Sequence, residues 1–109
     1  MELSNKVAIV TGGASGLGRA TTDVLAAGGA KIAIFDLNAE LGAEAVKALG
    51  ADNAGFWSVD VASAESVEAA VAAVVEKFGR IDVLVNCAGV GPAKKNIARD
   101  NNPVTDTPL

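Results

Sequence analysis

Short apolar runs alternate with longer amphipathic stretches along this sequence. The apolar runs cover residues 6–10, 32–35, 56–59 and 81–85, and they are rich in valine, isoleucine and phenylalanine. Continuous apolar runs of this length are typical of strands that are covered on both faces, as in a parallel sheet between helices. The sequence therefore predicts four buried strands.

The stretches between these runs carry apolar residues at helical spacing and predict helices over 16–27, 39–49 and 63–78. Asn38 and Ser63 are expected to cap the second and third helices, and glycines follow all three. Each helix should bury one apolar face. These faces are Leu17, Ala20, Val24 and Leu25 in the first helix, Leu41, Ala45, Val46 and Leu49 in the second, and Val67, Val71, Val74, Val75 and Phe78 in the third.

The alternation of strands and helices indicates an α/β protein with a parallel sheet and right-handed crossovers. The expected strand order is 3-2-1-4, which is the first part of a doubly wound sheet. No internal repeat and no linker occurs before residue 90. We therefore expect residues 1–89 to form one folded unit.

A glycine-rich turn follows the first apolar run, and residues 11–18 read Thr-Gly-Gly-Ala-Ser-Gly-Leu-Gly. Gly12 would let the chain turn off the strand, Gly16 would leave the backbone open to a phosphate, and Gly18 would allow close helix packing. Free N–H groups and the dipole of the following helix attract anions. The turn predicts a phosphate site, although it has neither G-x-G-x-x-G spacing nor the lysine of a P-loop. A glycine turn without a ligand is the alternative.

Composition narrows the class of protein. The chain has 109 residues, of which 50% are hydrophobic, so one ordered domain is expected. A net charge of -4 argues against a nucleic-acid partner. The N-terminus resembles neither a secretory signal nor an arginine-rich transit peptide, and no stretch approaches the ~18 apolar residues of a membrane span. We expect no membrane partner and no metal site, and the single cysteine favours a reducing, cytoplasmic setting.

The periodic pattern ends after Gly89. Residues 90–109 are rich in proline and asparagine and predict a loop or disordered tail. A small basic cluster there is interpreted as a solvated loop, with an anion site as the alternative; it comprises Lys94, Lys95 and Arg99. Thr107 and Pro108 form a helix-start signal with only Leu109 behind it. We therefore expect that the chain is cut short relative to its fold.

The pattern T-G-x-x-x-G-x-G at residues 11–18, followed by N-C-A-G at 86–89, resembles the short-chain dehydrogenase/reductase family. The resemblance covers residues 5–89, with the motifs in the family's order. It implies a Rossmann-type, NAD-binding half-domain over residues 1–89 and hydride transfer between NAD and a secondary alcohol or ketone. Within the family the motifs look most like the type-2 3-hydroxyacyl-CoA dehydrogenases, which implies a 3-hydroxyacyl-CoA substrate. That likeness also makes the mitochondrial matrix an alternative to the cytoplasm.

The resemblance assigns roles to polar residues at the strand ends. Asp36 lies 18 residues after Gly18, at the expected end of the second strand. Its carboxylate would accept hydrogen bonds from the adenosine ribose and repel a 2′-phosphate, which favours NAD over NADP. Ser15 stands where members that prefer NADP often carry a basic residue. Asp60 is expected beside the adenine. For both aspartates a turn residue without a ligand contact is the less favoured alternative. The full set of expected cofactor contacts is Gly12, Ser15, Gly16, Leu17, Gly18, Asp36, Asp60, Val61, Asn86, Cys87, Ala88 and Gly89.

The chain departs from the family because it contains no tyrosine, and it also has no histidine. The family's Tyr, Lys and Ser catalytic positions would lie beyond Leu109, so we expect no catalytic residue here, only NAD binding. Cys87, without a histidine to activate it, is interpreted as a small packing residue.

The fourth strand would become a sheet edge, which predicts self-association or a homo-oligomer. The alternatives to an enzyme fragment are a non-catalytic nucleotide-binding module and a structural partner that pairs through this edge.

Overall fold

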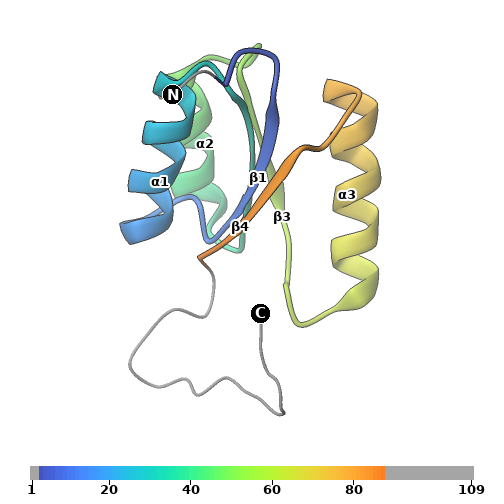
Figure 1. The fold of residues 1–109 in the computed structure, drawn as a ribbon. Coiled ribbons are helices and arrows are strands. Elements are labelled where there is room, and N and C mark those ends of the chain that lie inside the picture. The colour runs from blue at the N-terminus through green and yellow to red at the C-terminus, as the bar shows by residue number, and fades with distance from the viewer. Residues whose placement is uncertain (1–2, 88–109) are drawn as a thin grey trace, which may run out of the picture.

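The computed structural model describes residues 3–87 and confirms the alternating α/β order. The elements are β1 (Val7–Thr11), α1 (Gly16–Ala27), β2 (Lys31–Asp36), α2 (Ala39–Leu49), β3 (Ala54–Ser58), α3 (Ala64–Phe78) and β4 (Val83–Asn86). The described residues form a 4-stranded sheet in the order β3-β2-β1-β4, and all pairs are parallel. The helices α1 and α2 cover one face of the sheet and α3 covers the other (Figure 1). This is the predicted Rossmann-like order, and right-handed crossovers require this placement of the helices.

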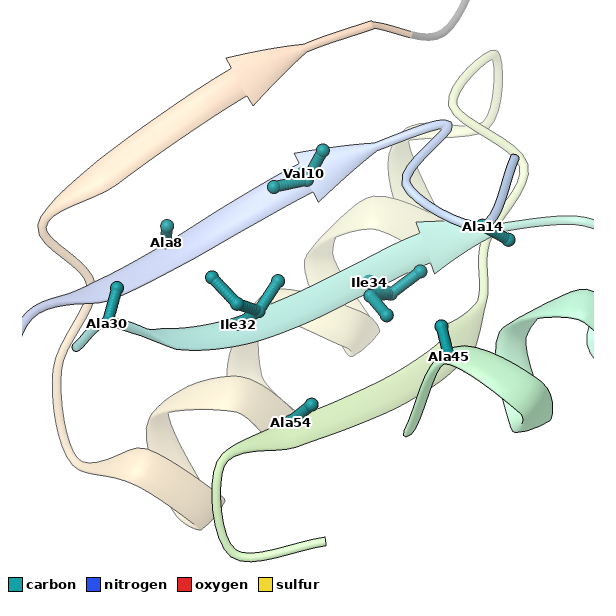
Figure 2. Close-up of a cluster of buried hydrophobic side chains, with 8 residues drawn as sticks. All are labelled: Ala8, Val10, Ala14, Ala30, Ile32, Ile34, Ala45 and Ala54. Atoms are coloured by element: carbon teal, nitrogen blue, oxygen red, sulfur yellow. The ribbon is translucent and has the colours of Figure 1, made fainter. Parts of the chain in front are cut away.

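The two central strands supply most of the core, which lies on both faces of the sheet. Val10 of β1 pairs in register with Ile34 of β2, and both side chains face α1 and α2 (Figure 2). Ile9 and Phe35 point to the opposite face and pack under α3. Every residue of β1 is buried, which explains why its sequence shows no alternation of polar and apolar positions.

The predicted N-caps are confirmed at α2 and α3. The Asn38 side chain accepts a hydrogen bond from the Leu41 N–H at 3.0 Å, and the Ser63 hydroxyl accepts one from the Ser66 N–H at 3.2 Å. Gly79 ends α3 in a left-handed conformation, as expected. After α1 the left-handed residue is Gly29, with φ 102°, rather than Gly28.

The predicted inward face of α1 is largely wrong. Leu17, Ala20 and Val24 are exposed, whereas Gly18 and Thr22 are the buried residues of this helix. A Cβ at position 18 would overlap a carbonyl oxygen of the glycine turn. This close approach fixes the rotation of α1, so the small residues face inward and the larger apolar ones face solvent.

The other predicted faces hold with one exception. Leu25 packs against the core, as do Leu41, Val46 and Leu49 of α2. On α3, Val75 is exposed, and Ala70, which was not predicted, is buried. The strand limits shift by one to two residues; β3 begins at Ala54 because Ala54 pairs with Ile32.

Several predictions fall on residues 88–109 and lie outside the described part of the chain. They concern Ala88, Gly89, the tail with its basic cluster, and the helix-start signal. Among the described helices, none has the length and apolar character needed to cross a bilayer.

Candidate functional site

The carboxyl ends of the parallel strands meet at one edge of the sheet, and the glycine turn lies there after β1. Gly12 adopts φ 68°, and its N–H donates to the Phe35 carbonyl oxygen of β2 at 2.7 Å. The backbone of Gly13 accepts a bond from the buried Thr22 hydroxyl of α1 at 3.3 Å. The turn is therefore held from β2 and from its own following helix.

The first turn of α1 differs from those of α2 and α3. Ser15 is the N-cap, but its side chain makes no capping hydrogen bond, and no acidic residue occupies the first turn. By contrast, α2 and α3 have side-chain caps and carry Glu40 and Glu65 in their first turns. The opening amides of a helix lack partners within the helix and carry a partial positive charge. The first turn of α1 has no acidic side chain to balance this partial positive charge.

Space for a ligand exists directly beside these amides. Gly16 has φ 59°, and a Cβ built there would meet no atom within 4 Å. At Gly18, in contrast, a Cβ would overlap the Gly12 carbonyl oxygen. The first glycine therefore leaves open room beside the backbone, and the second brings α1 against the turn. The close packing expected at Gly18 is therefore a contact between α1 and the turn that follows β1.

A hollow of about 130 Å³ lies beside the turn, at the ends of β1, β2 and β3. It brings Gly12, Asp36, Asp60 and Val61 together from three segments that are distant in sequence. Leu37 also lines it, and its side chain is 68% exposed. Leu37 was not predicted as a site residue. The available signal was an apolar residue directly after the strand-ending acid.

Both aspartates of the hollow make hydrogen bonds that a turn residue would make. Asp36 Oδ1 accepts from the Asn38 N–H at 3.0 Å, and Asp60 Oδ1 accepts from the Ala62 N–H at 2.9 Å. Asp36 Oδ2 accepts a second bond, from the Ala14 N–H of the glycine turn at 3.1 Å. A carboxylate oxygen has two acceptor positions, so these contacts leave capacity for a ligand hydroxyl.

The end of β4 is fastened to the end of β1 by a threonine hydroxyl. Thr11 Oγ1 donates to Asn86 Oδ1 at 2.7 Å and accepts from the Cys87 N–H at 3.1 Å. Asn86 thus braces β4 against the neighbouring strand β1. The Cys87 thiol is half-buried, with Thr21 Oγ1 4.0 Å away. The bracing places residues 86 and 87 at the same sheet edge as the glycine turn.

The described part of the chain has two larger hollows as well. One, of about 530 Å³, lies between α1 and α2 and is lined mainly by small side chains; its Asp23 is paired with Arg19 at 3.1 Å. The other, of about 300 Å³, is largely apolar, lies on the α3 face around Leu84, and adjoins the hollow at Asp36, because Phe35 and Val61 line both. Neither has a helix start, and the polar residues of the second, Thr11 and Asn86, bond each other. Within residues 3–87 no group of three His, Cys, Asp or Glu could hold a metal ion.

These features define a class of protein. A parallel sheet in the order 3-2-1-4, a glycine turn that opens a helix, and an acid at the end of the second strand together define a dinucleotide-binding fold. The family model described as "short chain dehydrogenase" matches residues 6–107. The chain therefore belongs to the short-chain dehydrogenase family, as its motifs predicted.

Individual relatives support the same assignment. The chain is 47% identical over 100 residues to 3-hydroxyacyl-CoA dehydrogenase type-2 of Drosophila melanogaster, covering 92% of this chain and 39% of that protein. It is 56% identical over 91 residues to D-threitol dehydrogenase of Mycolicibacterium smegmatis, covering 81% of this chain and 35% of that protein. The chain thus spans little more than a third of these relatives.

A solved structure extends the likeness to three dimensions. The 3-ketoacyl-(acyl-carrier-protein) reductase from Brucella melitensis, complexed with NADH, superposes with a TM-score of 0.73 at 36% identity, covering 76% of this chain and 34% of that one. Family and neighbour together support a nicotinamide cofactor, either NAD or NADP.

Proposed function

We propose that this chain is the NAD-binding part of a short-chain dehydrogenase. The observation that carries the proposal is the meeting of the Asp36 carboxylate, the Gly12 turn and the uncapped start of α1 at one sheet edge. Residues 1–89 are proposed as the nucleotide-binding unit. A bound nicotinamide group would supply the hydride donor or acceptor, and the residues of this chain would bind and orient it.

The pyrophosphate is assigned to the start of α1. The backbone at Ser15, Gly16, Leu17 and Gly18 would surround it, with the opening amides of the helix as donors. Two observations support this assignment: the free space beside Gly16, and the absence of an acid in the first turn of α1. A neighbouring carboxylate in that turn would compete with a phosphate for the same amides.

The adenosine is assigned to the hollow beside the turn. Asp36 would accept hydrogen bonds from the ribose hydroxyls, and its negative charge would oppose a 2′-phosphate, which favours NAD over NADP. Leu37 and Val61 expose apolar surface in this hollow and would cover the faces of the adenine. Asp60 would lie at the edge of the base.

The nicotinamide half is assigned to the end of β4, where Asn86 and Cys87 are held against Thr11. Ala88 and Gly89 complete the proposed motif. Hydride transfer between NAD and a secondary alcohol or ketone is proposed for the whole protein, with a 3-hydroxyacyl-CoA as the favoured substrate. The names of similar proteins include sugar-alcohol and acyl-CoA dehydrogenases, so this substrate rests on motif likeness.

The 109 residues contain no tyrosine, so we propose that they bind NAD without turning over substrate. A cytoplasmic location is proposed on the single cysteine alone. A second candidate function, self-association through the β4 edge, is favoured by Leu84, which is 65% exposed there.

Calorimetric titration with NAD and NADP tests the nucleotide proposal. We expect heat and a thermal shift with NAD and a weaker response with NADP. Neither heat nor a thermal shift at millimolar NAD would overturn it. Gly16→Ala should abolish most of the binding, because the new methyl group enters the phosphate space. Gly79→Ala is the matched control, since Gly79 also has a positive φ and open surroundings but lies at the end of α3.

A further inference from the structure

We infer that Asp36 is a positioning residue for the anion-binding turn, in addition to its proposed contact with the ribose. This inference rests on the proposed function but assigns a second task to the same carboxylate. Asp36 Oδ2 accepts the Ala14 N–H at 3.1 Å across a separation of 22 residues. The turn therefore depends on Asp36 before any nucleotide arrives.

Ala14 lies directly before the N-cap of α1, so its bond to Asp36 affects how the first amides of the helix are oriented. The Ala14 side chain is buried in the core between the sheet and the helices α1 and α2, beyond the end of β1 (Figure 2). Its N–H is directed to Asp36, and the next residue, Ser15, is the N-cap of α1. Fixing the plane of this peptide group sets the direction from which the amides of residues 16–18 emerge.

Asp36 is itself held in place. Its Oδ1 accepts the Asn38 N–H at 3.0 Å, so the carboxylate is tied at one oxygen to the start of α2 and at the other to the turn. The backbone adds a parallel tie, because Gly12 N–H donates to the carbonyl oxygen of Phe35, the residue before Asp36. The end of β2 thus serves as the template for the phosphate-binding turn.

The two tasks of Asp36 predict opposite effects on an anion that has no ribose. If Asp36 acted only on the ribose, deleting its negative charge would strengthen binding of inorganic pyrophosphate, because a nearby repulsion is removed. If it positions the turn, deleting it lowers the population of the binding-competent turn and weakens pyrophosphate binding in proportion. The sign of the change separates the two roles.

The experiment uses the whole chain labelled with ¹⁵N, titrated with inorganic pyrophosphate and followed at the amides of residues 12–18. The variants are Asp36→Ala, which removes the carboxylate, and Asp36→Glu, which keeps the charge but displaces it by one methylene. Asp52→Ala is the matched control, because it removes a negative charge at an exposed position before β3 that lies outside the hollow. We expect both Asp36 variants to weaken pyrophosphate binding by about fivefold or more, and Asp52→Ala to leave it unchanged.

Hydrogen exchange in the nucleotide-free chain supplies the second readout. The Ala14 amide should exchange faster in both Asp36 variants, while core amides such as those of Ile9 and Ala33 keep their protection and report that the variants are folded. Stronger pyrophosphate binding by Asp36→Ala, or unchanged Ala14 exchange, would overturn the inference. Loss of the proposed function would instead appear as failure of the unaltered chain to bind NAD.

Discussion

The Asp82 carboxylate accepts a hydrogen bond from the Val7 N–H at 2.9 Å, while the Asp82 N–H donates to the Val7 carbonyl oxygen at 2.8 Å. A side chain and a backbone group of one residue thus bind both polar groups of another. Arg80 holds the second carboxylate oxygen at 2.7 Å. The hydrogen bond from Arg80, followed by the bond from Val7, lowers the pKa of Asp82 below its ordinary value. The starts of β4 and β1 are joined at this point.

This bond predicts a pH-dependent contribution to stability. Because the pKa of Asp82 is lower in the folded state, its contribution is complete above the unfolded pKa of about 3.9 and is lost as the pH falls through the folded value. Asp82→Asn should lower the urea midpoint at pH 7, and the difference should shrink in acid. Asp52→Asn, at an exposed position before β3, is the control. An equal difference for Asp82→Asn at neutral and strongly acidic pH would contradict the mechanism.

Thr11→Val tests the fastening at the other end of β4. The substitution keeps the shape of the side chain but removes the hydroxyl that bonds Asn86 and Cys87. We expect the free energy of unfolding to fall by about 1 to 2 kcal/mol, measured by urea titration. The Thr21 hydroxyl donates to the Leu17 carbonyl oxygen within α1, and its contact with the Cys87 thiol is long, at 4.0 Å. Thr21→Val should therefore change stability by less than about 0.5 kcal/mol. Equal losses from the two variants would argue against a bracing role for Thr11.

A comparison of Gly18→Ala with Gly42→Ala distinguishes a loss of NAD binding at the site from a general loss of stability. Both glycines are buried in helices where a Cβ would overlap another group, namely the Gly12 carbonyl oxygen for Gly18 and the Phe56 ring for Gly42. Each variant should lose about 1 to 3 kcal/mol of stability. Only Gly18→Ala should also lose NAD affinity, by at least about tenfold. A loss of about 1.4 kcal/mol in the free energy of binding, caused by displacement of the turn, is enough for that change. The NAD affinities of the two variants are compared by titration calorimetry at a temperature where both are folded.

Much of the fold could be predicted from sequence because its signals are local. Apolar runs marked every strand, glycines marked the helix ends, and Asn38 and Ser63 marked N-caps. The rotation of α1 could not be predicted from apolar periodicity, since Leu17 and Val24 form as good a stripe as the true inward face. The buried Thr22 carried no apolar signal at all. Its spacing of four residues from Gly18 was the available clue, because close approach of a helix to a turn requires small residues on one face.

In the candidate site, too, some residues could be predicted from the sequence and some contacts could not. Gly12, Gly16, Asp36 and Asp60 could be selected from motif spacing, and the structure brings Gly12, Asp36 and Asp60 into one hollow. Leu37 was missed because an exposed leucine has no motif. The bond between Asp36 and Ala14 was also beyond prediction, because it joins two segments through a tertiary contact that spacing alone does not encode.

Leu84→Lys tests the proposed self-association. Leu84 is 65% exposed on β4, at the edge of the described sheet, and a lysine there should disfavour edge pairing. We expect sedimentation or light scattering to show a larger monomer fraction than for the unaltered chain. Val24→Lys adds the same charge at an exposed position on α1 and should leave association unchanged. A monomeric unaltered chain with one sharp thermal transition would contradict the proposal.

The hollow that receives Asp36 and Asp60 exists only while β1, β2 and β3 are paired. A nucleotide held there would bind the native chain and not the unfolded one. Free nucleotide at 100 times its dissociation constant would then add about 2.7 kcal/mol to the free energy of unfolding. For a chain of this size the ligand would act as a structural component, and resistance to proteolysis would rise and fall with its concentration.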